Sequence, residues 1–149
     1  MFRVHLANDH GGFLLRDIVI DWANSRGYQL IDHGNAKLDN TDNDFEYARL
    51  ALDGFSQDLE SGLKSRAILI CTSGIAMAIQ ANRLSGIRAV LPINPEHAKT
   101  SREHNDCNVL ALGGKFHSPG QTREILDIWF DTDYLSLARY NYRNHALDD

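Results

Sequence analysis

The chain has 149 residues and a formal net charge of -5, with twenty Asp and Glu residues against fifteen Lys and Arg. This length fits a single domain over residues 1–149, and an acidic balance without a basic run indicates neither a nucleic-acid-binding nor a membrane-surface protein. No apolar stretch approaches the roughly 20 residues of a membrane span and we expect no secretory signal, so two cysteines in separate predicted strands indicate a reduced, cytoplasmic compartment without a disulfide framework.

The first 60 residues alternate between strand-like and helix-like patterns. A β-rich run opens the chain, and the polar, glycine-rich Asn8–Gly12 separates it from an amphipathic helix. A short second strand leads into a polar stretch that we expect to be a surface loop. The predicted elements are a strand over 2–7, a helix with Leu15, Ile18, Val19 and Trp22 on one face that ends at Gly27, a strand over 28–32, a loop over 33–43, and a helix over about 44–59 with Ala48, Leu52 and Phe55 inward.

The stretch Ala67–Arg83 is the most informative part of the sequence. Five apolar residues, Ala67–Cys71, predict a fully buried strand, and Thr72–Gly74 then forms a turn. After the turn, apolar residues recur at helical spacing, at Ile75, Ala78 and Ile79. The pattern predicts a strand, a tight turn and a helix N-terminus.

In an open parallel sheet, such a junction lies at the carboxyl end of a strand. Unpaired backbone N–H groups and the positive end of the helix dipole there face a crevice that ligands use. Because this environment favours a thiolate, Cys71 is a candidate base or nucleophile. The alternative is that Cys71 is a small buried hydrophobe and Ser73 an N-cap.

The second half of the chain continues the alternation of strands and helices. The predicted elements are a strand over 87–91, a helix from Asn94 and Pro95 to about Glu103, a strand over 107–112, a helix after Ser118-Pro119 that buries Ile125, Ile128 and Trp129, and a last helix over about 135–146. Five strands alternating with helices predict an α/β fold, a Rossmann-like three-layer sandwich around a five-stranded parallel sheet.

Polar residues at the predicted strand ends are candidates for the chemistry. We expect Asp9, His10, Cys71, Ser73, and His104 and Asn105 after the fourth helix to gather there. Each alternative is structural: a helix cap, an exposed loop histidine or a helix-end histidine. The turn NDHGG is not a dinucleotide fingerprint, no phosphate-binding GxxxxGK[ST] occurs, and a Cys-x5-Arg phosphatase loop fails because residue 77 is Met. We expect no metal site from Asp9, His10 and His104, because no two histidines have i,i+4 spacing.

Several motifs together resemble the ribose-5-phosphate isomerase B family, which also includes galactose-6-phosphate isomerase subunits. The motifs are DHGG at 9–12, ILIC-x-SGI at 68–75, QANR at 80–83, GIRAV at 86–90 and SREHND-x-NVLALGG at 101–114. They occur in the family's order and span nearly the whole chain. The resemblance implies a cofactor-free aldose–ketose isomerase that forms dimers, often paired into tetramers, with sites shared between subunits.

The resemblance also implies a role for individual residues. Cys71 would be the base at C1 and C2, Ser73 would bind the reacting oxygens, His104 would be the acid/base of ring opening, and Asp9 would assist it. The backbone of the loop Thr72, Ser73, Gly74, Ile75 and Ala76 would hold the enediolate oxygen. The remaining substrate contacts would be Asn105, the phosphate clamp of Arg139 and Arg143, and His10, Lys115 and Tyr47.

Departures from the family pattern fall at the same site. Thr72 and Ala76 replace two glycines of the usual CGTGxG turn, which would strain the loop if those positions need a positive φ. Lys115 replaces an arginine and so loses its planar fork. Tyr140 replaces a histidine, and Tyr47 is kept without the proline of the usual DYPDYA segment.

These features predict an isomerase that interconverts ribose 5-phosphate and ribulose 5-phosphate in the non-oxidative branch of the pentose phosphate pathway. An isomerase of another sugar phosphate, such as allose 6-phosphate or galactose 6-phosphate, is the first alternative. The second is a catalytically silent sugar-phosphate-binding homologue, which the lost glycines would explain. We expect a homodimer or a pair of dimers, with no nucleic acid and no membrane as partner.

Overall fold

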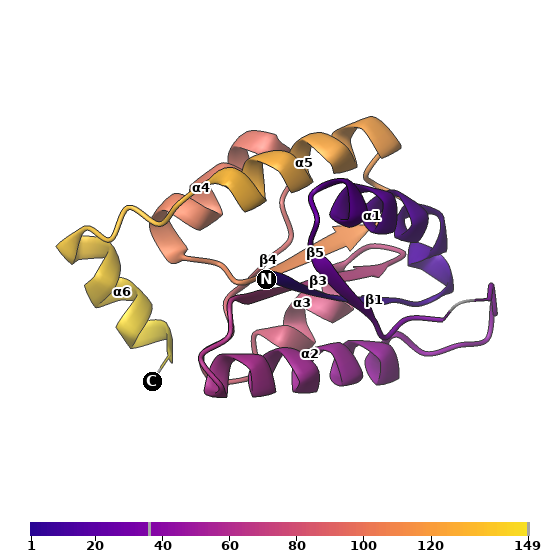
Figure 1. The fold of residues 1–149 in the computed structure, drawn as a ribbon, viewed down its shortest axis with the longest axis horizontal. Helices are drawn as coiled ribbons and strands as arrows, with labels where there is room; N and C mark the ends of the chain where they lie inside the picture. The colour runs from indigo at the N-terminus through magenta and orange to yellow at the C-terminus, as the bar shows by residue number, and fades with distance from the viewer. Residues whose placement is uncertain (36, 149) are drawn as a thin grey trace.

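The structure is a computed structural model that describes residues 1–35 and 37–148, so the expected loop over 33–43 lies partly outside the described residues. Within those residues no helix is both long and apolar enough to cross a membrane. The elements are β1 (Arg3–Asn8), η1 (His10–Gly12), α1 (Phe13–Ser25), β2 (Gln29–Asp32), α2 (Asp44–Glu60), β3 (Ser65–Cys71), α3 (Ile75–Ala81), β4 (Ala89–Val90), α4 (Pro95–Asn105), β5 (Val109–Gly113), α5 (Pro119–Asp131) and α6 (Ala138–Asp148) (Figure 1).

The five strands form one parallel sheet in the order β2-β1-β3-β5-β4. Helices α1, α4 and α5 cover one face and α2 and α3 the other, as Figure 1 shows above and below the sheet. This is the predicted α/β architecture, a Rossmann-like three-layer sandwich. Because all strands run the same way, the carboxyl ends of β1, β3 and β5 share one edge.

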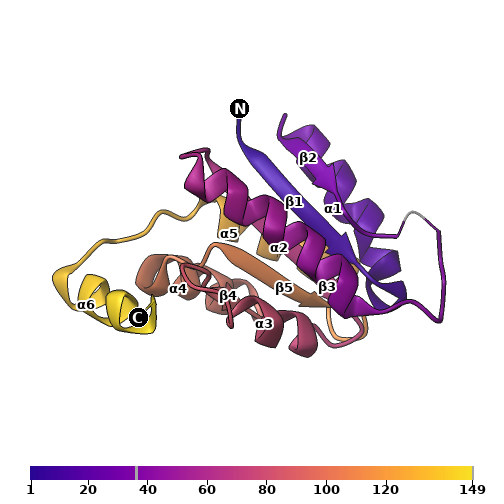
Figure 2. The same cartoon turned by 90° about the horizontal axis from the view of Figure 1, so that it is seen from below.

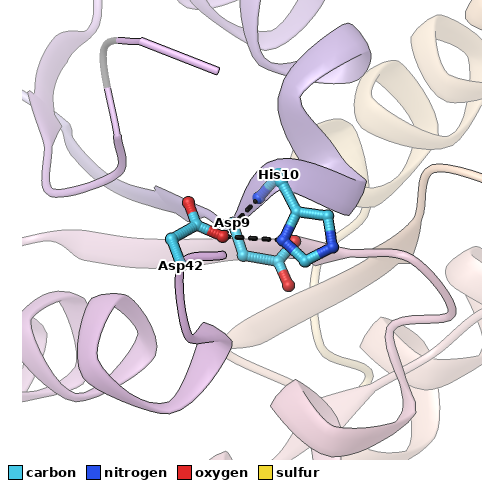
Figure 3. Close-up of side chains that lie close together, drawn as sticks. All are labelled: Asp9, His10 and Asp42. Atoms are coloured by element: carbon cyan, nitrogen blue, oxygen red, sulfur yellow. Dashed lines mark hydrogen bonds and ion pairs between the residues drawn. The ribbon is translucent and has the colours of Figure 1, made fainter. Parts of the chain in front are cut away.

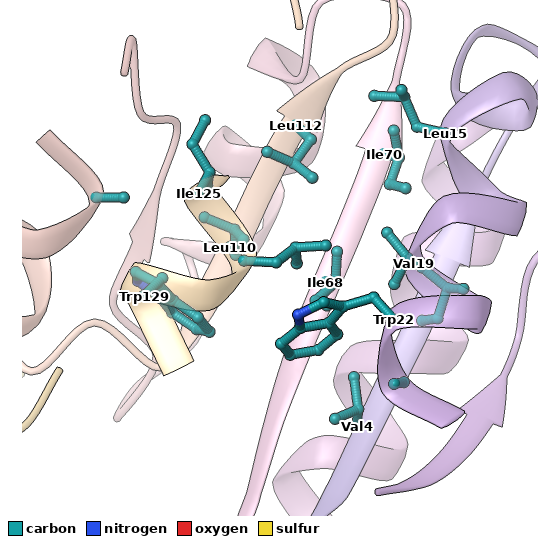
Figure 4. Close-up of a cluster of buried hydrophobic side chains, with 14 of the residues drawn as sticks. Val4, Leu15, Val19, Trp22, Ile68, Ile70, Leu110, Leu112, Ile125 and Trp129 are labelled. Carbon is teal, nitrogen blue, oxygen red and sulfur yellow. The ribbon is translucent and has the colours of Figure 1, made fainter. Parts of the chain in front are cut away.

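The central strand β3 explains why the core has two halves. Its residues Ile68 and Ile70 point into the cluster under α1 and α5 (Figure 4). Ala67, Leu69 and Cys71 belong to the other cluster, under α2 and α3. All five are at most 4% exposed. A strand buried on both faces needs a continuous apolar run, because successive side chains alternate between the faces.

The face that α3 buries differs from the predicted one. Ile75 and Ile79 are 54% and 53% exposed, whereas Met77 and Ala81 are fully buried. The helix has only seven residues and starts from Gly74 in a left-handed conformation, which sets its rotation about its own axis. An apolar pair therefore lies on the surface beside the carboxyl edge of the sheet.

The fourth strand is shorter than predicted, two residues instead of five. The Asn82 side chain donates to the Ala89 carbonyl at 3.0 Å and accepts from the Ala89 N–H at 2.8 Å. A side chain thus occupies the outer hydrogen-bonding groups of this edge strand. Capping an edge in this way is a common protection against pairing with another strand.

Helix α6 lies apart from the sheet, near the C-terminal end of α4 (Figures 1 and 2). Its Asn144 donates to the His104 carbonyl at 3.2 Å and accepts from the Asn105 side chain at 3.3 Å. In Figure 2, α6 is at the opposite end of the molecule from the strand arrowheads. The two ends of the sheet therefore carry different groups of candidate residues.

Candidate active site

The turn after β3 holds Cys71 and Ser73 by backbone donors. Gly74 N–H donates to Cys71 Sγ at 3.1 Å, and Ile75 N–H donates to Ser73 Oγ at 3.3 Å. Gly74 has a φ of +77°, which an L side chain rarely adopts. The predicted strand, turn and helix N-terminus are confirmed, and the thiol and the hydroxyl are both fixed at the carboxyl edge.

The two residues that replace glycines do not strain the turn. Among the described residues, Asp106 and Ser136 are the non-glycine residues with a positive φ. Thr72 and Ala76 are therefore outside the left-handed region, and Gly74 supplies the conformation that the turn needs. The structure thus removes the strain that the sequence pattern suggested.

Asp9 and the glycines that follow it pack directly against this turn. Asp9 Oδ1 accepts from Gly11 N–H at 2.8 Å and from Gly12 N–H at 3.2 Å, which caps η1. A Cβ on Gly11 would lie 2.5 Å from the Thr72 nitrogen, so glycine is required for this approach. Asp9 is buried, and this burial raises the pKa of its carboxyl group above the ordinary value.

His10 faces the same edge and is bound by a residue of the loop before α2. Asp42 Oδ1 lies 2.7 Å from His10 Nδ1 and accepts from the His10 backbone N–H at 2.9 Å (Figure 3). The hydrogen bond to Asp42 is the main reason why the pKa of His10 is raised. Tyr47 is half-buried at the start of α2, and partial burial is the main reason for its raised pKa.

The loop after β5 closes the third side of the turn. Cys71 is in register with Gly113, Gly114 N–H donates to the Cys71 carbonyl at 2.8 Å, and Lys115 N–H donates to the Thr72 carbonyl at 3.0 Å. The Lys115 side chain is on the surface. The backbone of this loop therefore holds the Cys71 turn.

Buried His117 ties this loop to the segment after β4. Its Nδ1 accepts from Gly113 N–H at 3.0 Å, and its Nε2 lies 2.8 Å from the Pro92 carbonyl oxygen. A cavity of about 310 Å³ borders Ser73, and its lining includes His117. The cavity is lined by Ser73, Ile75, Leu91, Pro92, Ile93, Phe116 and His117.

Four expected site residues lie at the other edge of the sheet. His104 and Asn105 end α4, before the loop that enters β5 at Val109, and Arg139 and Arg143 are on α6. A crossover helix runs antiparallel to the strands, so its C-terminus lies at their amino ends. β3 has seven residues, and at about 3.3 Å per residue its two ends are roughly 20 Å apart. The expectation that His104 and Asn105 join Cys71 at one edge is therefore wrong for a single chain.

Tyr140 organises the group at the amino edge. Its ring stacks on His104 with a centroid distance of 4.4 Å and an interplanar angle of 21°. The Arg139 guanidinium lies 4.7 Å from the centroid of the same ring and donates to the tyrosine hydroxyl at 2.9 Å. Arg143 is on the surface. His104, Tyr140 and Arg139 thus form one stacked cluster between α4 and α6, and Arg143 follows Arg139 by about one helical turn on α6.

Two residues of the carboxyl edge were missed by the sequence interpretation. Asp42 lies in a polar loop 32 residues from His10, and no local pattern connects them. His117 follows Gly114 by three residues in a segment interpreted only as a turn. A metal set of Asp9, His10 and His104 does not form within one chain, whereas ligand atoms of Asp9, His10 and Asp42 lie within 4.8 Å of one another.

The sequence matches the Ribose/Galactose Isomerase family over residues 4–147. It is 34% identical over 147 residues to ribose-5-phosphate isomerase B of Escherichia coli (strain K12), covering 99% of this chain and 95% of that protein. It is 35% identical over 112 residues to 4-deoxy-4-sulfo-D-erythrose isomerase of Clostridium sp. (strain MSTE9), covering 75% of this chain and 68% of that protein.

A solved structure of a ribose-5-phosphate isomerase B has the same fold as this chain. The crystal structure of ribose-5-phosphate isomerase B from Mycoplasma genitalium with bound ribulose-5-phosphate matches with a TM-score of 0.90 at 25% identity, covering 99% of this chain and 94% of that one. The resemblance that rests on the DHGG and SREHND motifs is thereby confirmed. The chain belongs to the ribose/galactose isomerase family.

Proposed function

We propose that this chain is an aldose–ketose isomerase that interconverts ribose 5-phosphate and ribulose 5-phosphate through ring opening and a cis-enediolate. The observation that carries the proposal is the fixed thiol of Cys71 at the carboxyl edge: its sulfur accepts from Gly74 N–H, Ser73 belongs to the same turn, and the Asp9 backbone N–H donates to the carbonyl of the preceding residue, Ile70. Membership of a sugar isomerase family supports the reaction class. No metal or organic cofactor is part of the proposed reaction.

The proposed reaction only moves protons and keeps the oxidation level of the whole molecule. After ring opening, the Cys71 thiolate takes the C2 proton, and the C2–H electron pair moves so that negative charge develops on O1. The same thiol then returns the proton to C1, while the hydroxyl proton on O2 moves to O1. Ser73 would donate to the reacting oxygens, since preorganised donors stabilise charge where it develops.

A complete site on this scheme needs two copies of the chain. Cys71 and Asp9 are at the carboxyl edge, whereas the His104 and Arg143 cluster is at the amino edge, so one chain offers two half-sites. We propose a homodimer, which could pair further into a tetramer, in which α4 and α6 of one copy approach the carboxyl edge of the other. His104 of that copy would open the ring, Asn105 would contact the sugar, and Arg139 and Arg143 would clamp the phosphate.

The names of two relatives indicate which sugars are candidate substrates. One is named a ribose-5-phosphate isomerase and another a 4-deoxy-4-sulfo-D-erythrose isomerase, so the family accepts more than one acidic sugar. An isomerase of another sugar phosphate, including allose 6-phosphate or galactose 6-phosphate, is therefore the second proposal. The retained Cys71, Ser73 and Asp9 speak against a silent binding homologue.

The test is ribulose 5-phosphate formation from ribose 5-phosphate by the purified protein in EDTA. Activity that survives EDTA and is lost in Cys71→Ala supports the proposal. Cys107→Ala is the matched control, because Cys107 is also a buried cysteine, 6% exposed, but belongs to the core under α1 and α5. If ribose 5-phosphate is not converted, the six-carbon phosphates are tested next, and inactivity on all of them would refute the isomerase.

A further inference from the structure

One carboxylate oxygen fixes both the backbone and the ring of His10. Asp42 Oδ1 accepts from the His10 backbone N–H at 2.9 Å and lies 2.7 Å from the ring Nδ1. The Asp42 side chain is 4% exposed, while the His10 side chain is 35% exposed. The aspartate is therefore a buried support, and the histidine is the part of the pair that a ligand can touch.

The same contact decides which ring nitrogen faces outward. With Nδ1 directed at Asp42, Nε2 is on the far side of the ring and points away from the aspartate (Figure 3). Asp42 comes from the loop that precedes α2, whereas His10 follows β1 directly. The loop thus sets the direction of a side chain that the sheet alone would leave free to rotate.

Three acidic residues near His10 act on its pKa in the same direction. Asp42 contributes through the hydrogen bond, and Asp9 and Asp39 add their negative charge, so the pKa of His10 is raised although partial burial opposes this. Asp9 comes from the end of β1, and Asp39 and Asp42 come from the loop before α2. A raised pKa favours the imidazolium near neutral pH.

We propose that Asp42 is a positioning residue that holds His10 as an imidazolium, with its Nε2–H directed at the anionic group of the substrate. The identity of that anion as a sugar phosphate rests on the proposed function. A cationic N–H donor to a phosphate oxygen makes a charge-assisted hydrogen bond, which is roughly twice as strong as a neutral one. His10 would then bind the phosphate from the Cys71 half-site, in addition to the arginine clamp that the second copy supplies.

The same geometry speaks against proton transfer by His10. A general acid or base works best when its pKa is near the working pH and both forms are accessible. A buried carboxylate on Nδ1 stabilises the charged form and opposes loss of the proton. Asp42 therefore suits a permanent cation that binds, and Asp42 variants should change KM with little change in kcat.

The first test needs no substrate. The imidazole signals of His10 are followed by NMR against pH in the wild-type protein, in Asp42→Asn and in Asp39→Asn. In Asp42→Asn the introduced amide can still accept the backbone hydrogen bond but lacks the charge, so the pKa of His10 should fall clearly in that variant. Asp39→Asn is the matched control, because it removes a charge of the same loop that acts on His10 only through space, while the Asp39 carboxylate accepts hydrogen bonds from Thr41 at 2.9 and 2.7 Å. Equal shifts in both variants would refute a specific role for Asp42.

The second test uses inorganic phosphate as the probe and then the isomerase assay. A hydrogen bond from a cation is roughly twice as strong as one from a neutral donor, so phosphate should bind about tenfold more weakly to Asp42→Asn and less than about twofold more weakly to Asp39→Asn. KM should rise similarly with kcat nearly unchanged. A fall in kcat at constant KM would overturn the proposal, because His10 would then act in proton transfer.

Two other outcomes are distinguishable. If Zn²⁺ or Mg²⁺ binds tightly at Asp9, His10 and Asp42 in the wild-type protein and competes with phosphate, the cluster is a metal site and the proposal is wrong. If the NMR and phosphate results are as expected but no sugar phosphate is isomerised, the proposed function fails while the role of Asp42 stands.

Discussion

Gly74 determines the geometry of the Cys71 turn, and replacing it with alanine tests that geometry. Its φ of +77° costs a non-glycine residue about 1–2 kcal/mol. An added Cβ would lie 2.6 Å from Leu91 Cδ1 and 2.9 Å from the Leu112 carbonyl carbon, and overpacking of this kind typically costs about 1–3 kcal/mol. Gly74→Ala should therefore lower the free energy of unfolding by about 2–5 kcal/mol.

Gly62→Ala separates the two contributions. Gly62 has a φ of +69°, but no atom of the residues that the structure describes lies within 4 Å of its added Cβ, so that only the backbone cost of about 1–2 kcal/mol remains. Urea unfolding of both variants beside the wild type gives the difference, which is the cost of the clash. Gly62 is also outside both groups of candidate site residues, so its variant should keep the wild-type activity.

The effect of Gly74→Ala should extend to the thiol. Because Gly74 N–H donates to Cys71 Sγ at 3.1 Å, a shifted turn changes the surroundings of the sulfur. Alkylation of Cys71 by iodoacetamide and isomerisation of ribose 5-phosphate should both change in Gly74→Ala and stay unchanged in Gly62→Ala. Equal destabilisation of the two variants, or wild-type alkylation and turnover in Gly74→Ala, would refute the reasoning.

Three further predictions test the surroundings of the site. His117→Leu leaves the Gly113 N–H and the Pro92 carbonyl without their His117 partner, so the free energy of unfolding measured in urea should fall by about 1–3 kcal/mol. In this variant kcat should fall by a larger factor than KM rises. A wild-type kcat would contradict a link between His117 and the Cys71 turn. Burial raises the pKa of the Cys107 thiol to about 11, so the unfolded state loses its proton first and stability should fall as pH rises from about 9 to 11, a dependence that Cys107→Ala should remove from the urea midpoint. The variants Cys71→Ala and Arg143→Ala should each be inactive alone, and a mixture of the two should regain about a quarter of the wild-type activity after subunit exchange. Half of the dimers then hold one subunit of each variant, and one of the two sites in such a dimer has both residues intact. No recovery would contradict the shared site.

The central strand and the helices with strong caps were predictable because their signals are local. Five apolar residues ending at Cys71, followed directly by a turn, are typical of a strand buried on both faces, and the structure buries them all. The Asn94 and Ser118 side chains cap α4 and α5 by accepting from His97 and Gln121 N–H, as the capping patterns indicate. Sequence periodicity suffices where a residue's neighbours along the chain decide its conformation.

The predictions for β4 and α3 were wrong because residues distant in sequence determine the structure there. Nothing near residues 87–91 indicates that the Asn82 side chain would take the outer hydrogen bonds of Ala89 and limit the strand to two residues. The rotation of α3 likewise follows from the close packing of Gly74 against Leu112, which the spacing of Ile75 and Ile79 does not encode. Both depend on contacts between segments that are separate in sequence.

The candidate site shows the same division. Asp9, Cys71 and Ser73 were predicted together because each lies at, or within two residues of, the end of a strand, and the carboxyl ends of parallel strands share an edge. Asp42 was missed because a long polar loop brings it to His10, and loops carry no periodic signal. The misplacement of His104 has another origin, since the direction of a crossover helix is enough to place its C-terminus at the opposite edge.

Cys71 and the α6 arginines lie at opposite edges of the sheet, and this separation gives a reason for the protein to assemble. The strands fix about 20 Å between the two ends of β3, and no change of side-chain rotamer can close this distance within one chain. The exposed Ile75 and Ile79 lie beside the carboxyl edge and offer an apolar surface next to the Cys71 turn. A second copy that covers this surface and brings its α6 arginines to the turn would complete the site, so that assembly would serve the chemistry directly and not only the stability of the fold.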